Sequence, residues 1–147
     1  MKKIILIAIV ICFNFQAYNV GAQESILECW VKTDAAIYRL RDDVIVNVYI
    51  SNKTKKVLRL LEPTLDKNSL TIEVIQPDGH KDELLGVYGL NLKKIKLYPF
   101  KRLKFKTDFN TEMLGEYTIT AVYRGYNGCV LQAEPVKIFV VRALDVQ

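Results

Sequence analysis

Residues that could do chemistry are few in this chain of 147 residues, and their spacing does not suit catalysis. The single histidine, His80, directly follows a Pro-Asp-Gly sequence, which favours a solvated turn residue over a general base. The chain has no second histidine and no G-x-S-x-G sequence that could supply a nucleophile with its base. The sequence therefore predicts no catalytic residues, and we expect that the protein is not an enzyme.

Two adjacent carboxylates, Asp42 and Asp43, are the other candidates for chemistry. Neighbouring residues on a strand point to opposite faces, and this pair lies at a predicted turn. We interpret both as turn formers, the alternative being a weak contribution to calcium binding. The cysteines have no C-x-x-C spacing, on which zinc binding or redox catalysis could rest. We therefore expect neither a metal nor a cofactor.

The first 22 residues have the layout of a secretory signal peptide. Two lysines precede an apolar run over residues 4–13, and the small residues Gly21 and Ala22 follow a more polar stretch. The apolar run is too short to remain as a spanning helix. A lipoprotein alternative would place a lipid on Cys12, but Ile11 occupies the preceding position, where a small residue is needed. We expect residues 1–22 to be cleaved, leaving a periplasmic or extracellular domain over 23–147 with no transmembrane segment.

Cleavage would leave a mildly basic domain with two cysteines, Cys29 and Cys129. In an oxidising compartment these most simply form a disulfide, the alternative being two free thiols. Removing Lys2 and Lys3 from the 21 basic residues leaves 19 against 16 acidic ones. So small a net charge argues little for a nucleic-acid partner, and we expect none. The oligomeric state stays open.

Apolar and polar residues alternate through most of the domain, which indicates strands with one buried face. Residues 51–56 form a polar turn, after which 57–61 is predicted to be the returning strand. Residues 80–97 are predicted to be a loop with one short strand. The pattern gives seven or eight short strands and no convincing amphipathic helix, which is typical of a two-sheet sandwich. The clearest predicted strands cover residues 26–33, 44–50, 57–61, 70–74, 102–109, 117–124 and 136–141.

The fragment Gly115-Glu116-Tyr117, followed by the alternating apolar residues Ile119, Ala121 and Tyr123, resembles the tyrosine corner of immunoglobulin-like and fibronectin-like domains. The resemblance implies a single immunoglobulin-like sandwich in which the Tyr117 hydroxyl bonds back to a nearby backbone group. The cysteines depart from the antibody arrangement. Cys29 lies on the first predicted strand and Cys129 just before the last, so their bridge would tie the chain ends together.

Residues 93–106 are strongly basic, with seven positive side chains in fourteen residues. One interpretation is the wet face of a strand whose lysines guard a sheet edge. The other is a patch for an anionic glycan, a lipid head group or an acidic protein, with Tyr98-Pro99-Phe100 as a projecting tip. The candidate patch comprises Lys94, Lys96, Tyr98, Phe100, Lys101, Arg102, Lys104 and Lys106.

These features favour an exported, non-catalytic binding or interaction module, because sandwich loops present contact residues on a rigid frame. The alternative is a small secreted protease inhibitor that presents sandwich loops. The sequence Asn52-Lys53-Thr54 also fits the glycosylation sequon, within the predicted polar turn.

The first testable consequence concerns the N-terminus. We expect the exported protein to begin near Gln23 and to carry no lipid, because Ala22 fills the small-residue cleavage position. Intact mass spectrometry of the exported protein measures this directly. An acylated N-terminal Cys12 would contradict the prediction.

Overall fold

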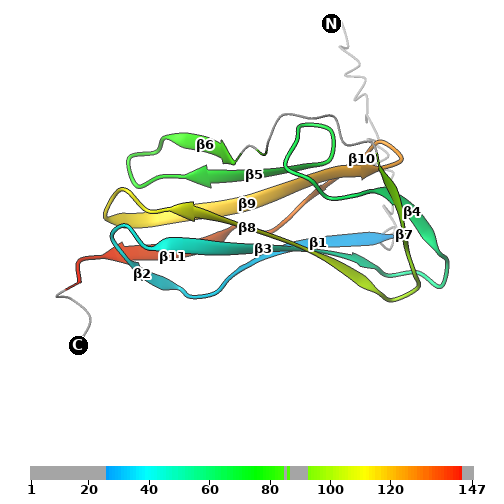
Figure 1. The fold of residues 1–147 in the computed structure, drawn as a ribbon, viewed down its shortest axis with the longest axis horizontal. Helices are drawn as coiled ribbons and strands as arrows, with labels where there is room; N and C mark the ends of the chain where they lie inside the picture. Colours follow the sequence, from blue (N-terminus) through cyan, green and yellow to red (C-terminus); the bar gives the residue numbers. More distant parts are fainter. Residues whose placement is uncertain (1–25, 85, 87–92, 144–147) are drawn as a thin grey trace, which may run out of the picture.

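The computed structural model describes residues 26–84, 86 and 93–143 of the chain. This part is all β, with eleven strands arranged in three sheets (Figure 1). The predicted seven or eight strands were too few, because several short strands have too few residues to establish a period. Within the described ranges, no helix is long and apolar enough to cross a membrane. The predicted signal peptide and cleavage site lie outside the described residues.

One layer of the sandwich is a three-stranded antiparallel sheet in the order β1-β3-β8. In β3, four apolar residues between Val44 and Ile50 are buried, and the residues between them are partly exposed, as the alternation predicts. β8 shows the same period, with Leu103 and Phe105 turned toward the core and the cations between them exposed. The strands are β1 (Leu27–Thr33), β3 (Asp43–Asn52) and β8 (Arg102–Asn110).

The other layer is a six-stranded sheet in which β9 is central. Its order is β2-β11-β9-β5-β6, and β10 pairs with β9 beyond the end of β11. All pairs are antiparallel except β2 with β11, which is parallel. β2 follows β1 in the chain but belongs to this second sheet. The members are β2 (Ile37–Arg39), β5 (Leu70–Ile75), β6 (Lys81–Leu84), β9 (Gly115–Tyr126), β10 (Cys129–Gln132) and β11 (Val136–Val141).

A separate two-stranded ribbon of β4 (Leu58–Leu61) and β7 (Lys94–Leu97) lies at one end of the sandwich (Figure 1). The prediction that residues 57–61 return alongside the preceding strand was wrong. β3 already pairs with β1 on one edge and β8 on the other, so it has no free edge for β4. The prediction of one short strand in 80–97 was also wrong, because β6 and β7 both lie in that segment.

Two tight turns shape the larger sheet. β5 and β6 are joined through Pro77-Asp78-Gly79, where Gly79 has a φ of 86° and donates its N–H to the Gln76 carbonyl at 2.9 Å. β9 and β10 are joined through Asn127 and Gly128, both with positive φ, as a two-residue hairpin turn requires. Gly125, close to this turn in sequence, lies within β9.

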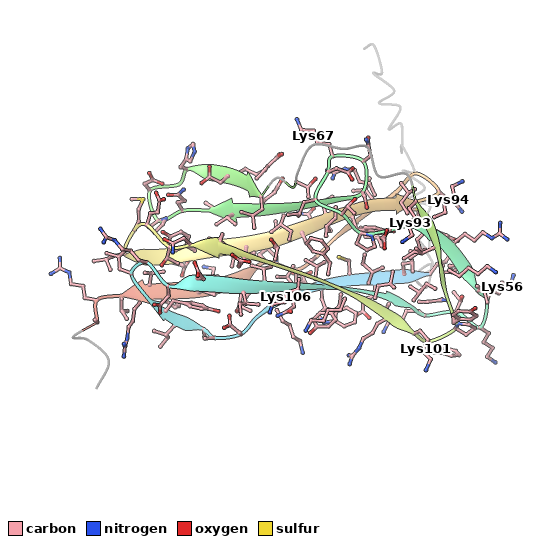
Figure 2. All side chains as sticks on the ribbon, in the orientation of Figure 1. Lys56, Lys67, Lys93, Lys94, Lys101 and Lys106 are labelled. Atoms are coloured by element: carbon pink, nitrogen blue, oxygen red, sulfur yellow. The ribbon has the colours of Figure 1, made fainter. Side chains whose placement is uncertain are left out.

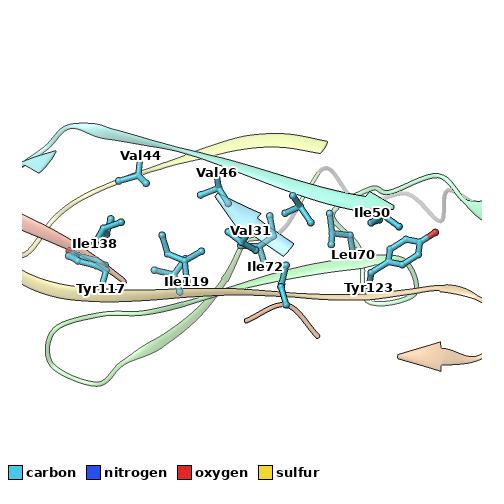
Figure 3. Close-up of a cluster of buried hydrophobic side chains, with 14 of the residues drawn as sticks. Val31, Val44, Val46, Ile50, Leu70, Ile72, Tyr117, Ile119, Tyr123 and Ile138 are labelled. Atoms are coloured by element: carbon cyan, nitrogen blue, oxygen red, sulfur yellow. The ribbon is translucent and has the colours of Figure 1, made fainter. Parts of the chain in front are cut away.

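The core fills the space between the two layers (Figure 3). The Val and Ile side chains of β3 face Ile72 of β5 and Ile119 of β9, all of them essentially inaccessible to solvent. Two tyrosines of β9, Tyr117 and Tyr123, lie at opposite ends of this row (Figure 3). Both rings are fully buried, so their hydroxyl groups need partners within the protein.

The Tyr117 hydroxyl forms two hydrogen bonds with the backbone of Met113. The oxygen accepts from the Met113 N–H at 2.9 Å and donates to the Met113 carbonyl at 3.1 Å. The ring therefore packs in the core while its polar tip closes the loop before β9, which is the geometry of a tyrosine corner. Gly115, two residues earlier, has a φ of 124°, and a side chain there would collide with Pro77 at 2.9 Å.

The stability of the sandwich should respond to this hydroxyl. We expect Tyr117→Phe to lower the free energy of unfolding by about 1 to 2 kcal/mol, because the ring packing stays and the Met113 backbone loses its partner. Denaturant unfolding measures the change, with Tyr98→Phe at an exposed position as the control. An unchanged midpoint for Tyr117→Phe would contradict a role in closing the loop.

Candidate functional site

The solvent-facing side of the β1-β3-β8 sheet gathers aromatic and basic side chains in cross-strand rows. Trp30 of β1 pairs with Tyr49 of β3, and Tyr49 pairs with Lys104 of β8. The next row contains Lys32, Asn47 and Lys106 in the same strand order. We call this surface the outer sheet face, defined by Trp30, Lys32, Tyr49, Arg102, Lys104 and Lys106.

Tyr49 is the centre of the outer sheet face. Its ring stacks on that of Trp30 with centroids 5.2 Å apart and an interplanar angle of 13°. The Arg102 guanidinium carbon lies 5.6 Å from the Tyr49 centroid, and the Lys104 ammonium lies 5.8 Å from it. Contact with the π face orders these two cations without neutralising them, so they keep their charge for a partner.

No carboxylate pairs with Lys32, Arg102, Lys104 or Lys106 within the described residues, although four other lysines there form ion pairs. Asn47, between Lys32 and Lys106, has a side-chain oxygen that is buried and lacks a hydrogen-bond partner among those residues. The outer sheet face therefore carries four cations without an ion-pair partner among the described residues, and two exposed acidic residues, Glu28 and Asp108, lie on the same side of β1 and β8.

Asp34 lies near enough to this surface for the charge of Lys106 to affect its pKa. The pKa of its carboxyl is lowered mainly because the Tyr38 hydroxyl donates to it at 2.5 Å, with smaller effects from backbone N–H groups and the Lys106 charge. The same oxygen also accepts from the Ile45 N–H at 3.1 Å. Asp34, in the connection between β1 and β2, therefore accepts hydrogen bonds from Tyr38 of β2 and Ile45 of β3.

The structure does not bring the predicted patch together as one surface. Arg102, Lys104 and Lys106 lie on the outer sheet face, whereas Tyr98 to Lys101 form a turn at the end of the molecule. Figure 2 shows this separation, with Lys106 midway along the sandwich and Lys101 at the end. The chain turns sharply after Leu97, so residues adjacent in sequence point to different sides.

The two lysines on β7 contribute to a third surface. Lys96 pairs with Arg59 across the ribbon. Lys94 lines a shallow cavity of about 450 Å³ together with Arg59 and Arg124. The Arg124 guanidinium donates to the Thr71 hydroxyl at 3.0 Å, which holds it at the cavity wall.

The turn between β7 and β8 presents two aromatic side chains to solvent. Tyr98 is 56% exposed and Phe100 is 64% exposed, and the Lys101 N–H donates to the Tyr98 carbonyl at 3.1 Å. Phe100 has a φ of 56°, a value that favours glycine or asparagine at this position of a turn. This backbone conformation of a phenylalanine costs of order 1 to 3 kcal/mol of folding free energy. Because the ring is exposed, its packing against the core offsets little of that cost.

Asn52 links the turn at 98–101 to the turn at 52–57 by hydrogen bonds. Its side-chain amide is buried and donates to the carbonyls of Lys56 at 2.7 Å, Leu97 at 3.0 Å and Tyr98 at 3.1 Å. Its side-chain oxygen accepts from the Thr54 N–H and hydroxyl. Asn52 of the sequon is thus a buried residue that links two turns by hydrogen bonds, and its amide hydrogens are not directed to solvent.

The predicted disulfide is not present in the structure, where both cysteines are free thiols. Cys29 turns inward from β1 and packs against the core, whereas Cys129 begins β10 with its side chain exposed. Burial raises the pKa of the Cys29 thiol to about 11. Burial also raises the pKa of Tyr123, with a further contribution from the charge of the Cys29 thiolate.

The remaining candidates for chemistry take structural positions. The His80 ring is largely exposed on the β5–β6 turn, with its Nε2 3.1 Å from Asp82. Asp42 accepts from the Arg39 N–H at 2.8 Å within the turn before β3, and Asp43 accepts from the Asn110 amide at 3.1 Å. Among the described residues, no group of three or more histidine, cysteine or acidic side chains could hold a metal ion.

Sequence reasoning missed the aromatic part of the outer sheet face. Alternation alone places Trp30 and Tyr49 on the solvent sides of their strands, since Val31 and Val48 are buried. The missing information was the register between β1 and β3, which brings the two rings together. Large aromatic residues at outward positions of two predicted strands were the available signal.

Comparison with known proteins identifies a fold and no specific family. No family model matches the chain, and no curated protein matches its sequence. Among solved structures, the ApaA protein from Bordetella pertussis is 14% identical with a TM-score of 0.52, over 80% of this chain and 95% of that one. An X-ray structure of the structural genomics target SoR45 is 12% identical with a TM-score of 0.53, over 86% and 95%.

The sporulation control protein Spo0M from Bacillus subtilis is 12% identical with a TM-score of 0.50. The match covers 78% of this chain and 49% of Spo0M, so the chain spans about half the length of that protein. At such low identity these likenesses show the fold alone. The chain is an immunoglobulin-like β-sandwich, as the tyrosine-corner resemblance implied.

The two thiols should differ sharply in reactivity. At pH 8 an alkylating reagent should modify Cys129 rapidly and Cys29 slowly, because a pKa of about 11 leaves roughly one Cys29 thiol in a thousand ionised. In denaturant both should react without prior reduction. Peptide mapping by mass spectrometry measures each site. A mass lower by two hydrogens and no alkylation before reduction would instead establish a disulfide.

Proposed function

We propose that this protein is an exported, non-catalytic binding module whose outer sheet face binds an anionic glycan. The observation that supports this most is the row of unpaired cations on β8, two of which lie over the ring of Tyr49. A linear polyanion that lies along β8 can contact a cation at every second residue of the strand. In the proposal the partner is recognised by charge and surface shape and undergoes no reaction.

The spacing of the cations suits a repeating ligand. Arg102, Lys104 and Lys106 are every second residue of β8 and share one face, so their Cα atoms follow one another at about 6 to 7 Å. Lys32 adds a fourth cation two strands away, beyond Asn47. Closely spaced positive charges raise the local potential even though the net charge of the whole chain is only +5.

The aromatic pair gives the surface a chemical character beyond charge. Trp30 and Tyr49 are each partly exposed on the solvent side, so the edges of their rings offer apolar contact beside the cations. Cations and ring edges together match the carboxylate or sulfate groups and the apolar faces of an acidic polysaccharide.

The test is retention on immobilised heparin as a model acidic polysaccharide. Changing Arg102, Lys104 and Lys106 together to glutamine should remove most of the retention, while thermal unfolding changes little because all three side chains are exposed. Retention of the parent should fall steeply with salt, since exposed charges are screened within about 10 Å at 0.1 M.

A charge-matched variant controls for the loss of three positive charges. Arg41, Lys67 and Arg142 are exposed and lie outside the three strands of the outer sheet face, so changing them to glutamine should lower retention only slightly. Equal losses in the two triple variants would show that retention follows net charge alone. That outcome, or passage of the parent through the column at low salt, would overturn the proposal.

A further inference from the structure

One end of the sandwich exposes an apolar cluster that the outer sheet face does not include. The cluster is built on the turn at 52–57, the turn at 98–101 and the start of β1, which adjoin because the Lys53 N–H donates to the Ile26 carbonyl and the Asn52 N–H to the Lys101 carbonyl. We call it the apolar end. Its exposed apolar side chains are Ile26, Val57, Tyr98 and Phe100, with exposed fractions of 42%, 47%, 56% and 64%.

Lysines surround the apolar end. Lys55, Lys56 and Lys101 are exposed and have no ion pair within the described part of the chain, whereas Lys53 pairs with Glu28 at 2.5 Å. Figure 2 shows Lys56 and Lys101 at this end of the molecule. Exposed rings within a group of unpaired lysines form a surface that is apolar at its centre and positive at its rim.

The backbone of this end is fixed before any partner binds. The buried Asn52 amide contacts carbonyls of both turns, so the two turns keep one relative position. Phe100 adopts a positive φ within the second turn, although its ring is the most exposed large apolar side chain of the described residues. Core packing within the described chain therefore does not compensate for the strained conformation that displays this ring to solvent.

We propose that the apolar end docks onto an anionic lipid bilayer. The rings of Tyr98 and Phe100 enter the boundary between head groups and acyl chains, and the surrounding lysines contact the lipid phosphates. A bilayer fits better than a protein groove because the apolar side chains project from two turns and the start of β1, and none of them lines the cavity beside Arg59 and Arg124. The flexible lysine side chains can extend to the head groups while their aliphatic parts stay near the apolar region.

The decisive variant is Phe100→Gly. Glycine adopts the positive φ without strain, so the variant should unfold at the same or a higher temperature than the parent. Loss of the ring should lower the partition coefficient onto vesicles about tenfold or more. Co-sedimentation with phosphatidylcholine vesicles containing phosphatidylglycerol measures binding, and a thermal melt measures stability.

Two controls make the result specific. Phe139→Ser removes a comparably exposed phenylalanine from β11 and should leave vesicle binding unchanged. Changing Lys55, Lys56 and Lys101 to glutamine should remove the preference for anionic over purely zwitterionic vesicles. Every variant is compared with its parent in the same full chain, so residues before Ile26 contribute equally.

The outcomes separate this proposal from the glycan-binding one. The proposal is overturned if Phe100→Gly binds vesicles as the parent does, or if the parent binds anionic and zwitterionic vesicles equally. Loss of vesicle binding in Phe100→Gly with unchanged heparin retention supports two independent surfaces. Loss of heparin retention in the β8 triple variant, with vesicle binding kept, completes that separation.

Discussion

Three buried polar side chains fix the positions of the segments that connect the strands. Tyr117, Tyr123 and Asn52 are all fully buried, and a buried polar group must find a hydrogen-bond partner or destabilise the fold. Each partner is a backbone group of a connecting segment or strand end. Tyr117 binds the loop before β9, Tyr123 donates to the Leu61 carbonyl at 2.6 Å at the end of β4, and Asn52 binds both turns beside the ribbon. The β4–β7 ribbon is thus attached to the sandwich by two interior side chains, although it shares no ladder with either sheet.

The same constraint explains a glycine whose role the sequence did not show. A side-chain carbon at Gly125 would lie 2.3 Å from the Tyr123 hydroxyl, so the ring can reach Leu61 only because this strand position lacks a side chain. Glycine normally weakens a strand interior, and it is kept where a side chain must approach the backbone closely. The attachment of the ribbon therefore depends on Gly125 as well as Tyr123. The position of the apolar end depends in turn on that ribbon, because Tyr98 directly follows β7.

Local periodicity predicted the long strands and failed where pairing decides the structure. β3, β8 and β11 alternate in exposure along six or more residues, and the apolar side chains of β5 and β9 alternate in sequence although parts of both strands are buried on both faces. β2, β4, β6 and β7 have three or four residues each, and the long-range partners that stabilise them leave no local trace. The disulfide prediction was wrong for a related reason, since spacing along the chain does not show that Cys29 points inward and Cys129 outward. The basic tract was visible as composition, but only the turn after β7 shows that it divides among separate surfaces.

That division changes what the positive charges can do. Along β8 the cations lie beside aromatic rings on a sheet, where they can meet charges spread along an extended ligand. At the apolar end the lysines surround exposed apolar side chains, where charge favours approach and burial of the rings would supply most of the binding free energy. Salt should weaken the first kind of contact strongly and the second only in part, because apolar burial is not screened. One continuous basic sequence thus contributes to both of these surfaces, which differ in their physical response, and the turn at Phe100, strained yet held by Asn52, separates them.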